Sequence, residues 1–471
     1  MTTPVGLDQA VRAILAEAQE VYRGSARASH WLHHQQARLA GPLTVAVLGA
    51  PKSGKSTLVS AYVGEEVAPV ELADGAQVTT WYQDGPQPRA VLYGPGGPWE
   101  APAARRDRRL DVDLRPWPAE RVDHIVIDWP GRNLREVTLI DTPGLPEPDR
   151  DATAVALERI VGVADCLLYL VRDTQAGELP ALRAALARPV PTAGAASTLL
   201  VLSRADEIGA GRIDALSSAK QIVRRYRRDE GVRAACQDVI AVAGLLAEAG
   251  RTLRDTEFAA FTALATVPRA SLEGFLLSAD RFTSPRFPVA LDVDTRRSLL
   301  HRFGMFGLRL GVTLVRQSCH EPVKLAAELV QRSGLAELRE SIDEYFVGRR
   351  EVLKARSALI ALDGLLRAEP MPAARRLFAE LERVLASAHD FRELRLLSAL
   401  RVGQVALPDE LATEARRLIG GVGTSLPDRL GVDYQTSPTE LQQRAFDALH
   451  RWQRETMNPM LSRTARRGAE T

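Results

Sequence analysis

The sequence predicts an α/β domain with a mostly parallel sheet, flanked by helices at both ends of the chain. Short apolar, β-branched runs such as Leu43–Leu48 end in glycine or polar turns, which is typical of buried strands. Longer stretches with apolar residues at helical spacing lie between and beyond these runs. The 471 residues are enough for about two or three domains. We expect a helical segment over residues 1–40, the α/β domain over 41–350 and a helical region over 351–471.

Composition favours a globular protein and gives no reason to expect nucleic acid as a partner. Hydrophobic residues make up 45% of the chain and charged residues 25%, as in ordinary globular proteins. The formal net charge is only +2, so the chain lacks the strongly basic character of many nucleic-acid-binding proteins. Cys166, Cys236 and Cys319 are widely spaced and fit neither a disulfide framework nor a metal site.

The first predicted element is a helical segment over Leu7–Leu39. Val11, Ile14 and Leu15 begin a series of apolar residues at helical spacing. Gly41-Pro42 follows and marks the boundary with the α/β domain, because both residues interrupt helices.

A glycine-rich loop comes directly after the strand Leu43–Leu48. Residues 49–57 match the pattern G-x-x-x-x-G-K-[ST] at Gly49, Gly54, Lys55 and Ser56. The glycines let the backbone curl around phosphates, and the dipole of the helix that follows favours negative charge there. Lys55 is expected to reach the β- and γ-phosphates, and Ser56 to bind Mg²⁺. The loop therefore predicts a nucleoside triphosphate site, to which Ser53 and Thr57 also belong, but it does not choose between ATP and GTP.

A second apolar strand, Val137–Asp141, ends in the sequence Asp-Thr-Pro-Gly. A carboxylate at a strand end can hold Mg²⁺ through water, and the N–H of a glycine just beyond can contact the γ-phosphate. We assign these roles to Asp141 and Gly144. Taken alone, the segment could also be an ordinary strand that ends in a Pro-Gly turn.

A third strand, Ser197–Ser203, precedes Arg204, Ala205 and Asp206. These residues form a relaxed version of the [NT]-K-x-D element that binds guanine. Asp206 would accept hydrogen bonds from guanine N1 and N2, and the Arg204 stem would pack on the base. An Asp that simply caps a helix is the alternative. The order of the three motifs is that of a GTPase domain, with GTP or GDP and Mg²⁺ as cofactors.

The stretch GAPKSGKSTLVSAYVGEEVAPVELADGAQVTTWYQ, the DTPG segment and LSRADEIGAGR resemble the dynamin superfamily of large GTPases. The similarity is greatest to actinobacterial members, including the mycobacterial isoniazid-inducible dynamin-like proteins, and covers roughly residues 40–350. It implies GTP hydrolysis to GDP and phosphate, stimulation by dimerisation through the GTPase domains, and action at membranes. It also implies that the N-terminal helix joins the C-terminal helices in a bundle. A longer dynamin-like partner and peripheral contact with anionic membrane are left open.

The resemblance implies further site residues. Thr79 would close over Mg²⁺ and the attacking water; Thr80 is the alternative, and we refer to this pair as the first switch. Both could instead be β-branched residues at a strand edge. Ala243 and Gly244 follow a predicted strand where a base-contacting loop belongs. The metal ligands are then Ser56, Thr79 and Asp141, the last through water.

The sequence differs from related GTPases at two positions, and each difference leads to a prediction about hydrolysis. Eukaryotic dynamins have a serine at the fourth position of the loop, which helps to bind a monovalent cation. Here the residue is Lys52, and we hypothesise that its ammonium replaces that cation. Leu145 follows Gly144, so the water-positioning glutamine of small GTPases is missing, and slow basal hydrolysis is expected.

The remaining segments have mixed patterns. Residues 85–120 indicate strand edges and loops, residues 250–315 helices with irregular parts, and residues 333–346 a helix that closes the domain. The apolar stretch Phe303–Val315 indicates a buried helix more than a membrane-inserting loop. Further helices are expected over about 373–401, 408–420 and 437–455, with Arg463, Arg466 and Arg467 in a frayed tail.

Three functional alternatives remain at this stage: a dynamin-like GTPase acting in membrane remodelling or maintenance, a GTP-controlled protein-binding switch or scaffold without membrane-deforming activity, and a ribosome- or RNA-associated GTPase. The near-neutral charge disfavours the third. The chain shows no signal peptide and no run of 18 apolar residues. We therefore expect a cytoplasmic protein, with any membrane contact peripheral at the inner face of the cell membrane.

Overall fold

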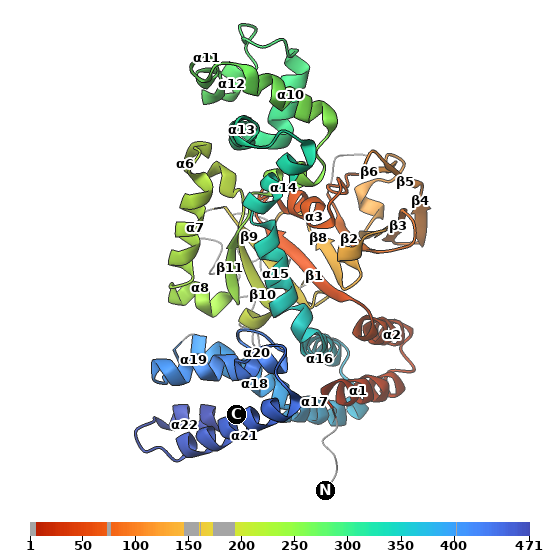
Figure 1. Ribbon diagram of the computed structural model, residues 1–471. Helices are drawn as coiled ribbons and strands as arrows, with labels where there is room; N and C mark the ends of the chain where they lie inside the picture. The colour runs from red at the N-terminus through yellow and green to blue at the C-terminus, as the bar shows by residue number, and fades with distance from the viewer. Residues whose placement is uncertain (1–5, 73–76, 146–159, 161, 173–193, 402) are drawn as a thin grey trace.

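A nine-stranded sheet runs through the middle of the protein, between helices α10–α13 at the top and a helical region at the bottom (Figure 1). This computed structural model describes residues 6–72, 77–145, 160, 162–172, 194–401 and 403–471. The strands are β1 Leu43–Gly49, β2 Thr79–Asp84, β3 Arg89–Gly94, β4 Gly97–Ala101, β5 Ala103–Arg106, β6 Arg109–Val112, β7 His124–Trp129, β8 Val137–Asp141, β9 Cys166–Val171, β10 Thr198–Leu202 and β11 Asp238–Ala241.

The helices from the N-terminus to the end of the sheet region are α1 Leu7–Val21, α2 Ala26–Ala40, α3 Lys55–Val63, α6 Ile208–Gly211, α7 Ala215–Tyr226, α8 Glu230–Ala235 and α9 Gly244–Arg251. They continue with α10 Asp255–Thr266, α11 Arg269–Glu273, α12 Ala279–Phe282, α13 Val293–Gln317, α14 Pro322–Arg332 and α15 Leu335–Tyr345. The last ones are α16 Arg350–Ala368, α17 Arg375–Ser387, α18 His389–Arg401, α19 Asp409–Leu418, α20 Leu426–Leu430, α21 Pro438–Thr456 and α22 Arg463–Ala469.

The strand order is β11-β10-β9-β1-β8-β2-β7-β3-β4. The strands from β11 to β8 run parallel, and β2 joins antiparallel to β8 with Thr80 opposite Asp141. Strand β1 therefore lies in the middle with a parallel neighbour on each side. In sheets of this kind ligands bind beyond the carboxyl ends of the strands. The predicted α/β class with a mostly parallel sheet is confirmed.

The central part of the sheet is buried on both faces, since β1, β8, β9 and β10 are buried at every position and mostly apolar. In β1, Ala46 and Leu48 belong to the core on one face, whereas Val45 and Val47 belong to the core on the other. This alternation follows from the two-residue period of a strand. A continuous apolar run is what a parallel sheet covered by helices on both faces requires.

The two ends of the chain meet below the sheet. Val11, Ile14 and Leu15 of α1 share one core with Leu359 and Leu362 of α16. Figure 1 shows α1 and α2 beside α16 and α17.

The helical segment expected over Leu7–Leu39 consists of two helices and not of one. The chain turns between α1 and α2, where the Ser25 side chain accepts the N–H of Ala28 and so begins a second helix. The Tyr22 hydroxyl donates to the carbonyl of Glu369 at 2.7 Å, which fixes the turn against the end of α16.

The C-terminal helices have a separate small core, which includes Leu397, Leu400 and Trp452. The expectation of a frayed tail is wrong: Arg463, Arg466 and Arg467 lie in α22, whose N-cap Ser462 accepts the N–H of Ala465. The predicted helix over 373–401 is divided at Ala388 into α17 and α18. In the ranges that the structure describes, no helix combines the length and the apolar character needed to cross a membrane.

The apolar stretch Phe303–Val315 lies within α13, as a largely buried helix. The helix is interrupted at Gly304, which has φ 62° and ψ 175°. This conformation is essentially restricted to glycine. The break brings the backbone of α13 close to residues that follow β10.

Candidate nucleotide-binding site

The glycine-rich loop joins the carboxyl end of β1 to the N-terminus of α3. Gly49 has φ 147°, and a Cβ there would lie 2.6 Å from the carbonyl oxygen of Leu170 on β9. Gly54 has φ 93°, a left-handed conformation that favours glycine. The two glycines of the motif are thus required by close packing at one position and by backbone conformation at the other.

Lys55 is buried at the first position of α3. Its Nζ donates to the carbonyl oxygens of Gly49 at 3.1 Å and Ala50 at 2.9 Å, so the ammonium lies inside the curve of the loop. Lys52 is exposed at the outside of the same loop, with φ 58°. The two lysines are therefore arranged differently, one enclosed by the loop and one at its surface.

Asp141 lies at the carboxyl end of β8, next to the loop. Burial raises the pKa of Asp141 to about 6, although a hydrogen bond with Ser56 and the charge of Lys55 both lower it. One of its oxygens, Oδ1, is buried without a hydrogen-bond partner, as is the Ser53 hydroxyl. A buried carboxylate oxygen without a partner, beside a serine hydroxyl, suits a hard cation such as Mg²⁺. Asp141 and Ser56, two of the three metal ligands that the sequence predicts, thus suit that ion.

The DTPG segment packs directly on the loop. The N–H of Leu145 donates to the carbonyl of Gly49 at 3.1 Å, and the Thr142 hydroxyl donates to the carbonyl of Val47 at 2.7 Å. A Cβ on Gly144 would lie 2.7 Å from the Cα of Pro51. Gly144 is therefore a glycine because the two segments approach too closely for a side chain.

The first switch lies at the start of β2. Thr80 is buried, pairs with Asp141 across the β2–β8 ladder, and donates its hydroxyl to the carbonyl of Val78 at 3.1 Å. Thr79 is half-buried and lies opposite His124 of β7. The structure thus brings Thr80 next to Asp141, with Thr79 one residue beyond.

A cavity continues from the loop to the segment after β10. Asp206 is buried in a short helical turn, and burial raises its pKa above the ordinary value. Arg204 has φ 51° and pairs with Glu207. The cavity is lined by residues from three parts of the chain: Ser53, Gly54, Thr57 and Leu58; Leu170, Val201, Ser203, Arg204, Asp206 and Glu207; and Val242, Gly244 and Leu245.

Ala243 and Gly244 have different places: Gly244 lines the cavity, whereas Ala243 lies behind it. Gly244 begins α9 and lines the cavity, and a Cβ there would lie 3.4 Å from Thr57. Ala243 is buried, and its N–H donates to the carbonyl of Ser333 at 2.8 Å. Ala243 therefore supports the wall and does not line it.

The sequence did not predict every residue of this cavity. Ser203 was predicted only as part of the relaxed motif, and no role in the site was predicted for Leu245. Gly304 was missed as well: a Cβ there would lie 3.9 Å from Oδ2 of Asp206. No local pattern connects Gly304 with the motif, because α13 lies far along the chain. An interrupting glycine in an apolar helix was the one available signal.

Comparisons with known proteins agree with this geometry. A protein-family model described as "50S ribosome-binding GTPase" matches residues 44–201, which contain the loop, the DTPG segment and most of β10. Sequences from two strains of Mycobacterium tuberculosis, CDC 1551 / Oshkosh and ATCC 25618 / H37Rv, are both named "Isoniazid-induced protein IniC". Each is 39% identical over 462 residues, which cover 96% of this chain and 93% of theirs.

Two solved structures of an oligomerised bacterial dynamin pair, described as a mechanism for the long-range sensing and tethering of membranes, also match. Their TM-scores are 0.36 and 0.34, at 14% and 13% identity. The matches cover 96% of this chain but only 66% and 67% of the solved chains. At these scores the likeness carries no argument about this chain.

Proposed function

The chain belongs to the family of the mycobacterial isoniazid-induced protein IniC, a family of dynamin-like GTPases, and on this premise we propose how its residues bind and hydrolyse GTP. Lys55 contacts the β- and γ-phosphates, and Ser56 with Asp141 holds Mg²⁺. Asp206 recognises guanine, and Arg204 packs on the base. The single observation that carries this assignment is Asp141, a buried carboxylate with one oxygen unpartnered, beside Ser56 and Lys55.

Bound Mg²⁺ would supply positive charge to the β- and γ-phosphates. The residues of the chain do the rest. Lys55 would exchange its two carbonyl contacts for phosphate oxygens, and the N–H of Gly144 would contact the γ-phosphate. The first switch would hold the attacking water, with Thr79 as the metal-contacting residue and Thr80 as the alternative.

We further propose that Lys52 supplies the charge that a monovalent cation supplies in other dynamins. The ammonium is carried by the loop itself, so no ion has to bind before negative charge develops. Lys52 is exposed on the loop, at a residue with a left-handed backbone.

At the level of the whole protein, we propose a dynamin-like GTPase that self-associates through its GTPase domains and contributes to membrane remodelling or maintenance. A longer dynamin-like partner and peripheral contact with anionic lipid belong to the same proposal, with no role for nucleic acid. The domain division at residues 40 and 350 is proposed with it, and the shared core of α1 and α16 supports a bundle made from both ends of the chain. A GTP-controlled protein-binding switch without membrane-deforming activity is the alternative.

The test measures GTP turnover across protein concentrations, with and without liposomes of anionic lipid. Turnover per molecule that rises with concentration supports stimulation by dimerisation. Co-sedimentation with liposomes that depends on GTP supports the membrane role, whereas a GTP-dependent protein complex without lipid binding supports the switch. Absence of GTP and GDP binding to folded protein would overturn the assignment of the site.

A further inference from the structure

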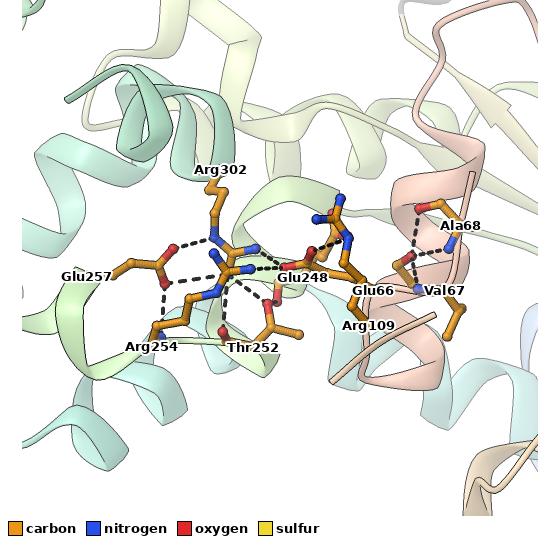
Figure 2. Close-up of polar contacts among 10 residues, drawn as sticks. Glu66, Val67, Ala68, Arg109, Glu248, Thr252, Arg254, Glu257 and Arg302 are labelled. Carbon is orange, nitrogen blue, oxygen red and sulfur yellow. Dashed lines mark hydrogen bonds and ion pairs between the residues drawn. The ribbon is translucent and has the colours of Figure 1, made fainter. Parts of the chain in front are cut away.

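A cluster of ion pairs around Arg302 joins three parts of the chain (Figure 2). The groove that contains it shares Thr57 and Leu245 with the nucleotide cavity. Arg302 of α13 pairs with Glu66, which follows α3, and with Glu257 of α10. Its guanidinium also donates to the carbonyl of Thr252 at 3.1 Å and to the Thr252 hydroxyl at 2.9 Å. The three charged side chains are only 11%, 14% and 8% exposed, for Arg302, Glu66 and Glu257 respectively.

Glu66 lies between α3 and β2, and its backbone is hydrogen-bonded to the chain around β6. Its N–H donates to the carbonyl of Arg108 at 3.0 Å, and its carbonyl accepts the N–H of Leu110 at 2.9 Å. The next residue, Val67, accepts a hydrogen bond at 3.2 Å from the hydroxyl of Tyr82. Tyr82 lies on β2, the strand that begins with the first switch. One buried hydrogen bond therefore connects β2 with the residue that follows Glu66.

Arg302 lies on α13, a helix that also approaches the segment from Arg204 to Gly211. We call this segment the base-binding wall, because it contains Asp206. Two residues further along α13, Gly304 interrupts the helix beside Asp206. Beyond the break, Arg309 donates to the carbonyl of Gly211, and a Cβ on Gly211 would lie 3.3 Å from the carbonyl oxygen of Asp206. Helix α13 thus lies close to the Asp206 segment at two points, Gly304 and Arg309.

Glu66 is shared by three arginines, of which Arg302 is the most buried, at 11% exposed. Arg254 and Arg109 also pair with Glu66, at 3.1 Å and 3.5 Å. Nearby Glu248 is half-buried, and burial together with the charge of Glu66 raises its pKa to about 7. Separating two largely buried opposite charges is destabilising, so the Glu66–Arg302 pair favours arrangements in which both parts of the chain keep their relative positions.

We propose that the Glu66–Arg302 ion pair couples the first switch to the base-binding wall, and that Arg302 is a positioning residue for GTP. This inference rests on the proposed nucleotide site. When the first switch engages a triphosphate, β2 and Glu66 take one fixed position, and Arg302 then fixes α13 against Asp206. Because coupling is reciprocal, correct seating of guanine also favours the engaged position of the switch. GDP lacks the γ-phosphate that engages the first switch, so the affinity for GDP does not depend on this coupling.

The experiment compares Glu66→Gln with Glu257→Gln. Both substitutions remove a buried carboxylate charge from Arg302 and keep the side-chain shape, but only Glu66 connects to β2. We measure the affinities of fluorescent GDP and of a non-hydrolysable fluorescent GTP analogue, together with thermal unfolding. Glu66→Gln should reduce the ratio of GTP-analogue to GDP affinity by at least about fivefold, the lower end of ordinary coupling. Glu257→Gln should leave that ratio within about twofold, whatever its effect on thermal unfolding.

A second pair of variants protects the test against simple misfolding. Arg302→Lys keeps a positive charge and should retain most of the wild-type ratio, whereas Arg302→Met should reduce it as Glu66→Gln does. In the double variant of Glu66→Gln and Arg302→Met the two effects should not add, because both break the same contact. Arg297→Met serves as the control on α13, since Arg297 is 67% exposed in its pair with Asp294.

The results distinguish failure of the coupling from failure of the nucleotide site. Equal changes of the ratio in Glu66→Gln and Glu257→Gln, no change in either, or additive effects in the double variant would overturn the coupling while leaving the nucleotide site intact. Wild-type protein that binds neither nucleotide would overturn the proposed function and the coupling together.

Discussion

The carboxylate of Asp165 accepts the backbone N–H of Thr44 at 2.8 Å, and so joins the segment before β9 to the start of β1. The same buried carboxylate contacts Arg38 of α2 at 3.1 Å and Lys354 of α16 at 3.5 Å. The hydroxyl of Ser357 donates to it as well. The strand that carries the phosphate loop at one end is thus held at its other end by helices from both termini.

Asp165→Ala should destabilise the fold. It leaves Arg38 and Lys354 buried without their carboxylate, and the loss of one partner of a buried pair costs about 3–5 kcal/mol. Urea unfolding measures the change in the free energy of unfolding. Asp294→Ala is the control, because Asp294 is 91% exposed and its loss should cost less than about 0.5 kcal/mol. Equal effects of the two substitutions would contradict the prediction.

Lys55→Ala should abolish nucleotide binding and turnover and leave the fold intact. The substitution removes the ammonium enclosed by the loop, which donates to the carbonyls of Gly49 and Ala50. Fluorescent GTP titration and circular dichroism check the two parts of the prediction. Lys324→Ala, at an exposed lysine of α14, is the matched control. Wild-type turnover in Lys55→Ala would show that the loop assignment is wrong.

Asp206→Asn should weaken GTP binding by about 100-fold or more, because the amide replaces one of two charge-assisted acceptors for guanine by a donor. Competition of GTP, ATP and xanthosine triphosphate for the site measures the change in base preference. Asp214→Asn removes an exposed charge that does not line the cavity and should retain the preference for guanine. An unchanged preference in Asp206→Asn would assign base recognition to other residues.

Turnover of the wild type should be the same in K⁺, Na⁺ and choline buffers, because Lys52 carries its own positive charge. Lys52→Ala should lower turnover by about tenfold or more, as expected for the loss of a charge that stabilises the transition state. Steady-state turnover in the three salts at equal ionic strength is the measurement. Strong K⁺ dependence of the wild type would exclude this role for Lys52.

Glu248 should make stability depend on pH. Its pKa is about 7 in the folded protein and 4.5 ordinarily, so between these values the folded state keeps a proton that the unfolded state releases. The free energy of unfolding should therefore fall as pH rises through this window, by up to about 3 kcal/mol. Urea unfolding of wild type and Glu248→Gln at several pH values isolates the contribution. A constant difference between the two proteins would contradict it.

Local sequence patterns predicted the fold class and the motifs, because a strand, a glycine loop and a helix are set by neighbouring residues. The strands expected at Leu43–Leu48 and Val137–Asp141 are β1 and β8. The turn between α1 and α2 was missed because apolar spacing continues across it, although Gly24 and Ser25 gave a local signal. Likewise, Ser462 marked the start of α22.

Long-range contacts could not be predicted in this way. Gly304 beside Asp206, and Glu66 beside Arg302, join segments that no local pattern relates. The order of strands in the sheet likewise depends on contacts between segments that are far apart in the sequence. The sequence therefore indicated residues of the proposed nucleotide site, but not what holds them in position.

The core shared by α1 and α16 has a consequence for how the protein is made. Helix α1, with Val11, Ile14 and Leu15 on one apolar face, leaves the ribosome before α16, so the part of this face that packs on α16 lacks that partner until synthesis has passed Arg350. Until then that face can attract chaperones or other nascent chains. Completion of the bundle is therefore a late event in biogenesis, after the sheet domain has had time to fold.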